Sequence, residues 1–83
     1  MGFTVYILFS VTKDRYYIGY TSNLEERIVR HNQKSNGFTG KVNDWKVVYD
    51  EKYETKEQAQ QRELQIKSWK NRIKIQELIS KRD

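Results

Sequence analysis

The fold is decided by residues 3–20, which have the sequence FTVYILFSVTKDRYYIGY. Side chains alternate between two faces over Phe3–Phe9, and this two-residue period predicts a β-strand. Ser10–Asp14 is polar and typical of a turn, and Arg15–Tyr20 is again rich in β-branched and aromatic residues. The two runs therefore predict an antiparallel hairpin, with Gly19 expected to end or kink its second strand.

Downstream of the hairpin, the chain predicts a helix, a loop and a third strand. Ser22 with Glu25 three positions later is a capping-box signature, and the helical spacing of apolar residues behind it predicts a helix over about 23–33. The run Gln33–Asn43 has the composition of a loop. Trp45–Glu51 alternates again and predicts a strand.

The last third of the chain predicts two more helices. Thr55 with Gln58 repeats the capping-box signature, and the stretch that follows contains no Gly and no Pro. It predicts a helix over about 55–70 and, after a break near Asn71, a third helix. The apolar residues expected to face the sheet are Ala59, Ile66, Ile73, Ile75, Leu78 and Ile79. The order strand, strand, helix, strand, helix, helix predicts an α+β fold, a small three-stranded antiparallel sheet flanked by helices.

Composition narrows the class of protein. We expect one domain over residues 1–83, because a second core needs at least as many residues again. The sequence has no Cys, which excludes disulfides, thiolate zinc sites and cysteine nucleophiles and favours a cytoplasmic location. No run approaches the roughly 18 apolar residues of a membrane-spanning helix, so a membrane partner is not expected. Sixteen Lys and Arg against 11 Asp and Glu give a net charge of +5, which favours a polyanionic partner.

Three ionisable side chains fall on or beside the expected apolar stripes. Arg27 and His31 lie one helical turn apart at the margin of the apolar stripe, where an arginine lying over apolar surface and an ordinary boundary histidine are the simpler explanation. Glu63 falls on the stripe that should face the sheet, and a buried carboxylate costs several kcal/mol unless a cation or metal accompanies it. A helical ion pair with Lys67 is the alternative.

Two further features attract attention. Tyr6 and Tyr17, on adjacent strands, are expected to present hydroxyls on one face of the hairpin, although strand tyrosines usually only pack. Residues 62–83 are strongly basic and contain Trp69, a combination that can bind a phosphate backbone, while a solvated helical face with Trp69 in the core is the ordinary alternative.

Taken in order, these motifs resemble the GIY-YIG nuclease domain, and within that superfamily the small stand-alone, single-domain bacterial proteins. The resemblance extends over nearly everything from Val5 to Ile79. The residues that carry it are Thr4-Val5-Tyr6, Tyr17-Ile18-Gly19, Arg27, His31 and Glu63 within Gln61-Arg62-Glu63-Leu64.

The resemblance implies hydrolysis of a DNA phosphodiester assisted by a divalent metal, Mg²⁺ or Mn²⁺. It implies that Glu63 holds the metal and that Tyr17 helps to position or deprotonate the attacking water. Tyr6 would orient the site by hydrogen bonding, and Arg27 would neutralise charge on the phosphate. His31 would take or relay a proton.

The chain departs from the family pattern at two places. Residues 4–6 read Thr-Val-Tyr where the family has Gly-Ile-Tyr, so the tyrosine is retained as Tyr6. Many members carry an active-site asparagine well after the glutamate, whereas Asn71 is the only asparagine after Glu63 and lies close to it in sequence. The small proteins that this chain resembles often lack that asparagine.

The sequence therefore favours a metal-dependent endonuclease that acts on duplex or branched DNA in repair or recombination. Recognition of DNA shape rather than sequence is expected, because 83 residues leave no room for a separate recognition domain. The alternative is a nucleic-acid-binding module that keeps the fold without turnover. A monomer or weak dimer is expected, with a protein partner left open. The lysines expected to contact nucleic acid are Lys34, Lys41, Lys67 and Lys70.

Overall fold

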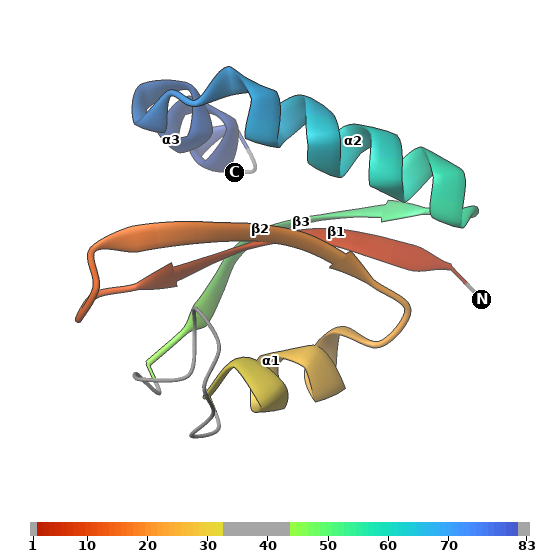
Figure 1. Cartoon of the computed structure of the whole chain (residues 1–83), viewed down its shortest axis with the longest axis horizontal. Coiled ribbons are helices and arrows are strands. Elements are labelled where there is room, and N and C mark those ends of the chain that lie inside the picture. The colour runs from red at the N-terminus through yellow and green to blue at the C-terminus, as the bar shows by residue number, and fades with distance from the viewer. Residues whose placement is uncertain (1, 33–43, 82–83) are drawn as a thin grey trace.

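The protein folds into a three-stranded antiparallel sheet with helices on both faces (Figure 1). The computed structural model describes residues 2–32 and 44–81. The predicted α+β class and element order are confirmed. The elements are β1 (Phe3–Ser10), β2 (Arg15–Thr21), α1 (Leu24–Asn32), β3 (Lys46–Tyr53), α2 (Lys56–Trp69) and α3 (Arg72–Ser80). The predicted loop 33–43, with Lys34 and Lys41, lies outside the described residues.

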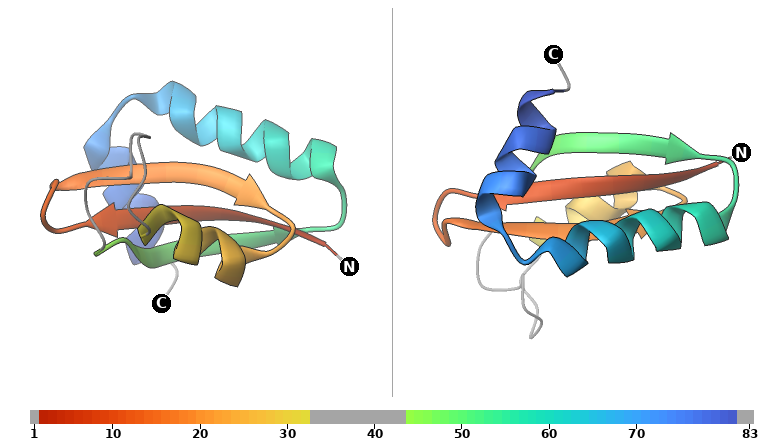
Figure 2. Two further views of the ribbon diagram at one scale, coloured as in Figure 1. Left: turned by 60° about the horizontal axis from the view of Figure 1, so that its bottom comes forward. Right: turned by 90° about the horizontal axis from the view of Figure 1, so that it is seen from above.

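Strand β1 is the centre of the sheet, whose strand order is β2-β1-β3. Helices α2 and α3 cover one face and α1 covers the other (Figure 1). Seen from above, α2 runs alongside β2 and α3 turns across the strands (Figure 2). Both faces of β1 are consequently buried, since Ile7 packs under α2 and α3 and its neighbour Leu8 packs on the α1 face, each with 0% exposure. This double burial explains why both alternating sets of residues 3–9 are largely apolar.

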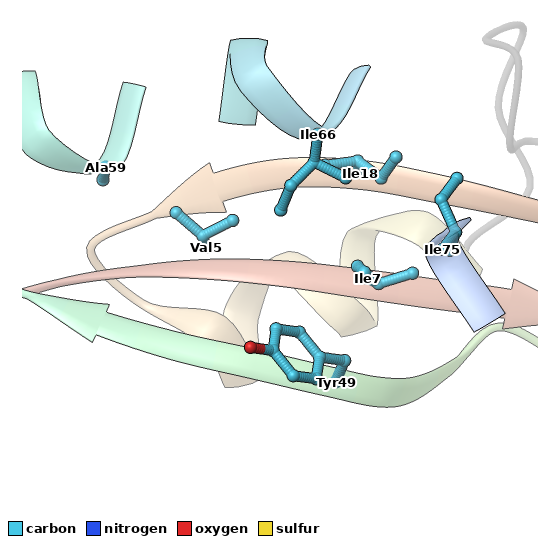
Figure 3. Packing of buried hydrophobic residues seen from close by; sticks show 7 residues of the cluster. All are labelled: Val5, Ile7, Ile18, Tyr49, Ala59, Ile66 and Ile75. Atoms are coloured by element: carbon cyan, nitrogen blue, oxygen red, sulfur yellow. The ribbon is translucent and has the colours of Figure 1, made fainter. Parts of the chain in front are cut away.

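The larger core lies between the sheet and the pair α2 and α3 (Figure 3). Its buried members are Val5, Ile7, Ile18, Tyr49, Ala59, Ile66 and Ile75. The predicted stripe is correct for Ala59 and Ile66 but wrong for Ile73, which is 66% exposed. The seven-residue repeat is interrupted at Lys70, whose left-handed backbone (φ 46°) ends α2, so Ile75 rather than Ile73 faces the core.

Polar caps set the helix ends. The capping box of Thr55 and Gln58 is present as predicted. Asn71 begins α3, where its Oδ1 accepts hydrogen bonds from the backbone N–H of the second and third following residues at 2.9 and 3.3 Å. The cap predicted at Ser22 is wrong, because α1 begins at Leu24 and Asn23 Oδ1 accepts a hydrogen bond from the backbone N–H of the third residue of the helix at 3.1 Å.

Within the described ranges, no helix combines the length and apolar character that crossing a bilayer requires.

A polar cluster around Glu51 ties β3 to α2. The Glu51 carboxylate accepts hydrogen bonds from the hydroxyls of Tyr49 and Tyr53 and from Arg62 Nε and Nη2, at 3.0 and 3.1 Å for the arginine. Burial acts to raise the pKa of Glu51, but these hydrogen bonds outweigh it and lower the pKa. The Arg62 guanidinium also lies 5.7 Å from the ring centre of Trp69, which is half-buried against the core. Trp69 is therefore a packing residue.

Truncating the two isoleucines of the predicted stripe distinguishes the observed core from an uninterrupted helix. Ile66→Ala leaves a cavity under α2, so we expect a loss of about 2–5 kcal/mol in the free energy of unfolding. Ile73→Ala, at an exposed position, should change it by no more than about 0.5 kcal/mol. Urea denaturation measures both, and equal losses would contradict the break between α2 and α3.

Candidate active site

An open hollow of about 450 Å³ lies beside β2, one of the two edge strands of the sheet. Four elements contribute to it, and its lining residues include Tyr6, Tyr17, Gly19, Arg27, Lys56 and Glu63. The tyrosines come from the face that α1 covers, whereas Lys56 and Glu63 come from α2 on the opposite face. The hollow therefore gathers side chains from both layers around the sheet edge.

Gly19 makes room for the Tyr6 side chain. The two residues are direct partners in the pairing of β1 with β2, and this pairing continues without a shift to Thr21. Gly19 thus neither ends nor kinks the strand, contrary to the prediction. A Cβ at Gly19 would lie 2.6 Å from the Tyr6 hydroxyl and 2.8 Å from Cζ, and Tyr6 is only 2% exposed, so a side chain here would force the buried ring to shift. The glycine is required because the tyrosine crosses β2 at this point.

A buried hydrogen bond joins Tyr6 to His31 behind the hollow. The Tyr6 hydroxyl and His31 Nε2 are 3.2 Å apart, and His31 is 7% exposed. The imidazole meets the Tyr17 ring edge-on at a centroid distance of 4.5 Å. The Trp45 ring is a further neighbour, with 6.4 Å between its centre and that of the His31 ring. His31 is therefore a core residue of the α1 face and not the boundary residue of the simpler explanation.

Burial also fixes the protonation of this pair. Burial, with Arg27 as the second cause, lowers the pKa of His31. Burial, followed by the nearby Tyr17, raises the pKa of Tyr6, and Arg27 only partly opposes the change. At neutral pH the imidazole is therefore neutral and the Tyr6 phenol keeps its proton.

Arg27 and Glu63 supply opposite charges to the hollow. Arg27 is exposed on α1, and it makes no ion pair with any residue in the described ranges. The Glu63 side chain is only 13% exposed, and its Oε2 lies 3.5 Å from Lys67 Nζ. Both explanations of Glu63 thus have a counterpart in the structure, since the carboxylate faces the hollow and also forms the helical pair.

The other predicted residues lie elsewhere. Lys70 and Asn71 line a separate hollow near the β1–β2 turn. Because Asn71 caps α3, it does not supply the asparagine that many family members carry. Lys56 lines the candidate site but was missed by the sequence reasoning. Its seven-residue spacing from Glu63 on the predicted helix is the signal that places both on one face.

The donor set restricts which metal the hollow can hold. Glu63 is the one carboxylate among its lining residues, and the described part of the chain has no group of three or more His, Cys, Asp or Glu side chains arranged for a metal. Such a site does not suit Zn²⁺, which needs several protein ligands. It fits Mg²⁺ or Mn²⁺, because Mg²⁺ commonly takes one or two carboxylates and completes its shell with water and phosphate oxygens.

The fold and the hollow define a small α+β domain that carries two tyrosines, an arginine and a glutamate around one open site. Residues 2–76 match the model of the GIY-YIG catalytic domain, and the chain belongs to this family of nuclease domains. It is 40% identical over 78 residues to a UPF0213 protein of Clostridium perfringens, a match covering 93% of this chain and 83% of that protein. A UPF0213 protein of Natronomonas pharaonis is 34% identical over 77 residues, covering 92% and 88%. No solved structure gives a significant match. The predicted resemblance is confirmed.

The lowered pKa of His31 predicts a pH-dependent stability. Below its ordinary pKa of 6.5 the unfolded chain binds a proton that the folded chain does not, so the free energy of unfolding should fall as the pH drops from 7.5 to 5.5. His31 is the only histidine, and the slope cannot exceed about 1.4 kcal/mol per pH unit for one proton. Urea denaturation of wild type and His31→Gln measures it. In the variant, the free energy of unfolding should no longer change over this pH range. An equal pH dependence in both proteins would contradict the buried neutral imidazole.

Proposed function

We propose that this chain is a metal-dependent endonuclease that hydrolyses DNA phosphodiester bonds in the hollow beside β2. The observation that carries the proposal is the meeting of Tyr6, Tyr17, Arg27 and Glu63, from four elements, around one open space. Membership in a family of nuclease domains and the net charge of +5 support a DNA substrate.

Arg27 is assigned to the charge that develops on the phosphate. During hydrolysis a water oxygen bonds to phosphorus, the ester P–O bond breaks, and negative charge builds up on the phosphoryl oxygens. A guanidinium offers several N–H donors in a plane and matches two phosphate oxygens at once. Since Arg27 has no ion pair with a described residue, its donors are available to the substrate.

The tyrosines and His31 are assigned to the attacking water. Tyr17, which lines the hollow, positions the water by hydrogen bonding. Tyr6 can accept a proton from the water on its oxygen while it passes its own proton to the neutral His31, 3.2 Å away. Because the pKa of His31 is lowered, the imidazole has a ring nitrogen available for that proton at neutral pH.

Glu63 is assigned to the metal. When bound there, Mg²⁺ or Mn²⁺ supplies a Lewis acid that polarises the phosphoryl group. Lys67 Nζ lies 3.5 Å from the same carboxylate, so the lysine and the ion compete for it. Lys67 is therefore assigned to this pair rather than to a direct DNA contact.

The proposed substrate is DNA recognised by its shape, such as the branched or flapped forms of repair and recombination, in the cytoplasm. Reading a sequence requires side chains that reach base edges over a large interface. The groups at the hollow are those that recognise phosphate, which every DNA sequence shares.

A second candidate is a nucleic-acid-binding module without turnover. The ion pair of Glu63 with Lys67 favours it, because this pair is what a purely structural glutamate would form. The position of Asn71 at the start of α3, away from Glu63's hollow, also favours it.

Replacing one carboxylate separates the two candidates. Glu63→Gln keeps the side-chain volume but removes the charge that holds a divalent ion, so metal-dependent cleavage should be lost. DNA affinity measured without metal should hold or rise slightly, since an anion facing phosphates has been removed. The measurement is cleavage of single-stranded, duplex, flapped and four-way DNA with Mg²⁺ or Mn²⁺.

Glu57→Gln is the matched control, because Glu57 is an exposed glutamate on α2 outside the hollow's lining. This variant should cut as the wild type does. Equal cleavage by wild type and Glu63→Gln would contradict the metal role. A wild type that binds these DNAs and cuts none of them would favour the binding module.

A further inference from the structure

One positively charged side chain that lines the hollow, Lys56, has no part in the proposed mechanism. Lys56 is the first residue of α2, is exposed, and lines the hollow together with Glu63 and Arg27. Lys56 lies outside the residues that carry the family resemblance.

The local structure gives Lys56 no stabilising role. The positive end of a helix dipole lies at the N-terminus, where a cation is unfavourable. At the equivalent position of α3, Arg72 is neutralised by Asp14, with 2.6 Å between Nη2 and Oδ1. Lys56 makes no such ion pair with any residue in ranges 2–32 and 44–81. A cation in this unfavourable position, without an ion pair to a described residue and beside an open site, is placed to bind a ligand that carries negative charge.

Two cations reach the hollow from opposite layers. Arg27 comes from α1 and Lys56 from α2, on the two sides of the sheet edge. Along α2, Lys56 precedes Glu63 by seven residues, which corresponds to about 10 Å of helix. An anion that extends past Glu63 along the helix therefore meets Lys56 at a second point.

We propose that Lys56 binds a non-scissile phosphate of the DNA strand that enters the hollow. That this phosphate neighbours the one being cut rests on the proposed function. Lys56 is a binding residue and takes no part in the chemistry, so its loss should weaken DNA binding and raise KM without changing kcat.

Lys52 offers a matched control, because it is exposed on β3 at the opposite edge of the sheet and does not line the hollow. Lys56→Gln and Lys52→Gln remove the same charge. We would measure the Kd of a fluorescent DNA duplex for both variants and for wild type by anisotropy, in EDTA, at 50 and 200 mM salt. Melting curves of the same samples report the fold.

If Lys56 neutralises one phosphate, the ratio of the Lys56→Gln Kd to the wild-type Kd should shrink about threefold between the two salt concentrations. Lys52→Gln should show no such change. The melting temperature of Lys56→Gln should equal or exceed that of wild type, because the substitution removes a cation from a helix N-terminus.

Four outcomes decide the assignment. The same salt dependence in both variants, or no DNA affinity in the wild type, overturns the role of Lys56. A wild type that cuts DNA while Lys56→Gln binds normally overturns it and keeps the nuclease. A wild type that never cuts, combined with the expected shrinking of the Lys56→Gln Kd ratio, supports the phosphate contact and contradicts only the nuclease.

Discussion

The site depends on one contact, in which the Tyr6 side chain crosses β2 over Gly19. Its ring is buried on the α1 face, and its hydroxyl reaches both His31 and the hollow at the sheet edge. A methyl group in place of the Gly19 hydrogen would overlap that hydroxyl. The tyrosine of the first strand motif and the glycine of the second thus meet one packing requirement, which also places the Tyr6 hydroxyl 3.2 Å from His31 Nε2.

The central strand β1 connects this contact to the rest of the molecule. Because both of its faces are buried, it carries Tyr6 against α1 while Val5 and Ile7 anchor α2 on the other side. The α2 helix then brings Glu63 and Lys56 to the edge strand. The core and the candidate site therefore depend on the same elements, and charged side chains from two layers meet at the edge of a sheet only three strands wide.

Much of the fold could be predicted from local patterns, because alternation and caps act over a few residues. The hairpin and the Thr55 capping box are examples. The burial of His31 could not be predicted, because Trp45, from a distant segment, shares its cluster. The seven-residue repeat of apolar residues predicts Ile73 in the core, but this repeat crosses the break between α2 and α3, whose geometry is set by Lys70 and Asn71. Lys56 was missed because its seven-residue spacing from Glu63 gains meaning only once Glu63 is known to face a hollow. Local patterns singled out Tyr6, Tyr17 and Glu63 separately, but only the family resemblance grouped them into one site, since no local rule brings Tyr6 and Glu63 together across a sheet edge.

Paramagnetic NMR tests most directly whether this hollow is a metal-dependent phosphate site. Mn²⁺ broadens the amide signals of residues near it, so titration into isotope-labelled protein maps the ion without requiring activity. We expect the signals of Gly19, Tyr20 and the residues around Glu63 to fade first and those of β3 around Lys52 to persist, and we expect Glu63→Gln to abolish this selectivity. Signals that fade first at other carboxylates, such as Asp44 or Glu54, while the hollow is unaffected, would contradict it.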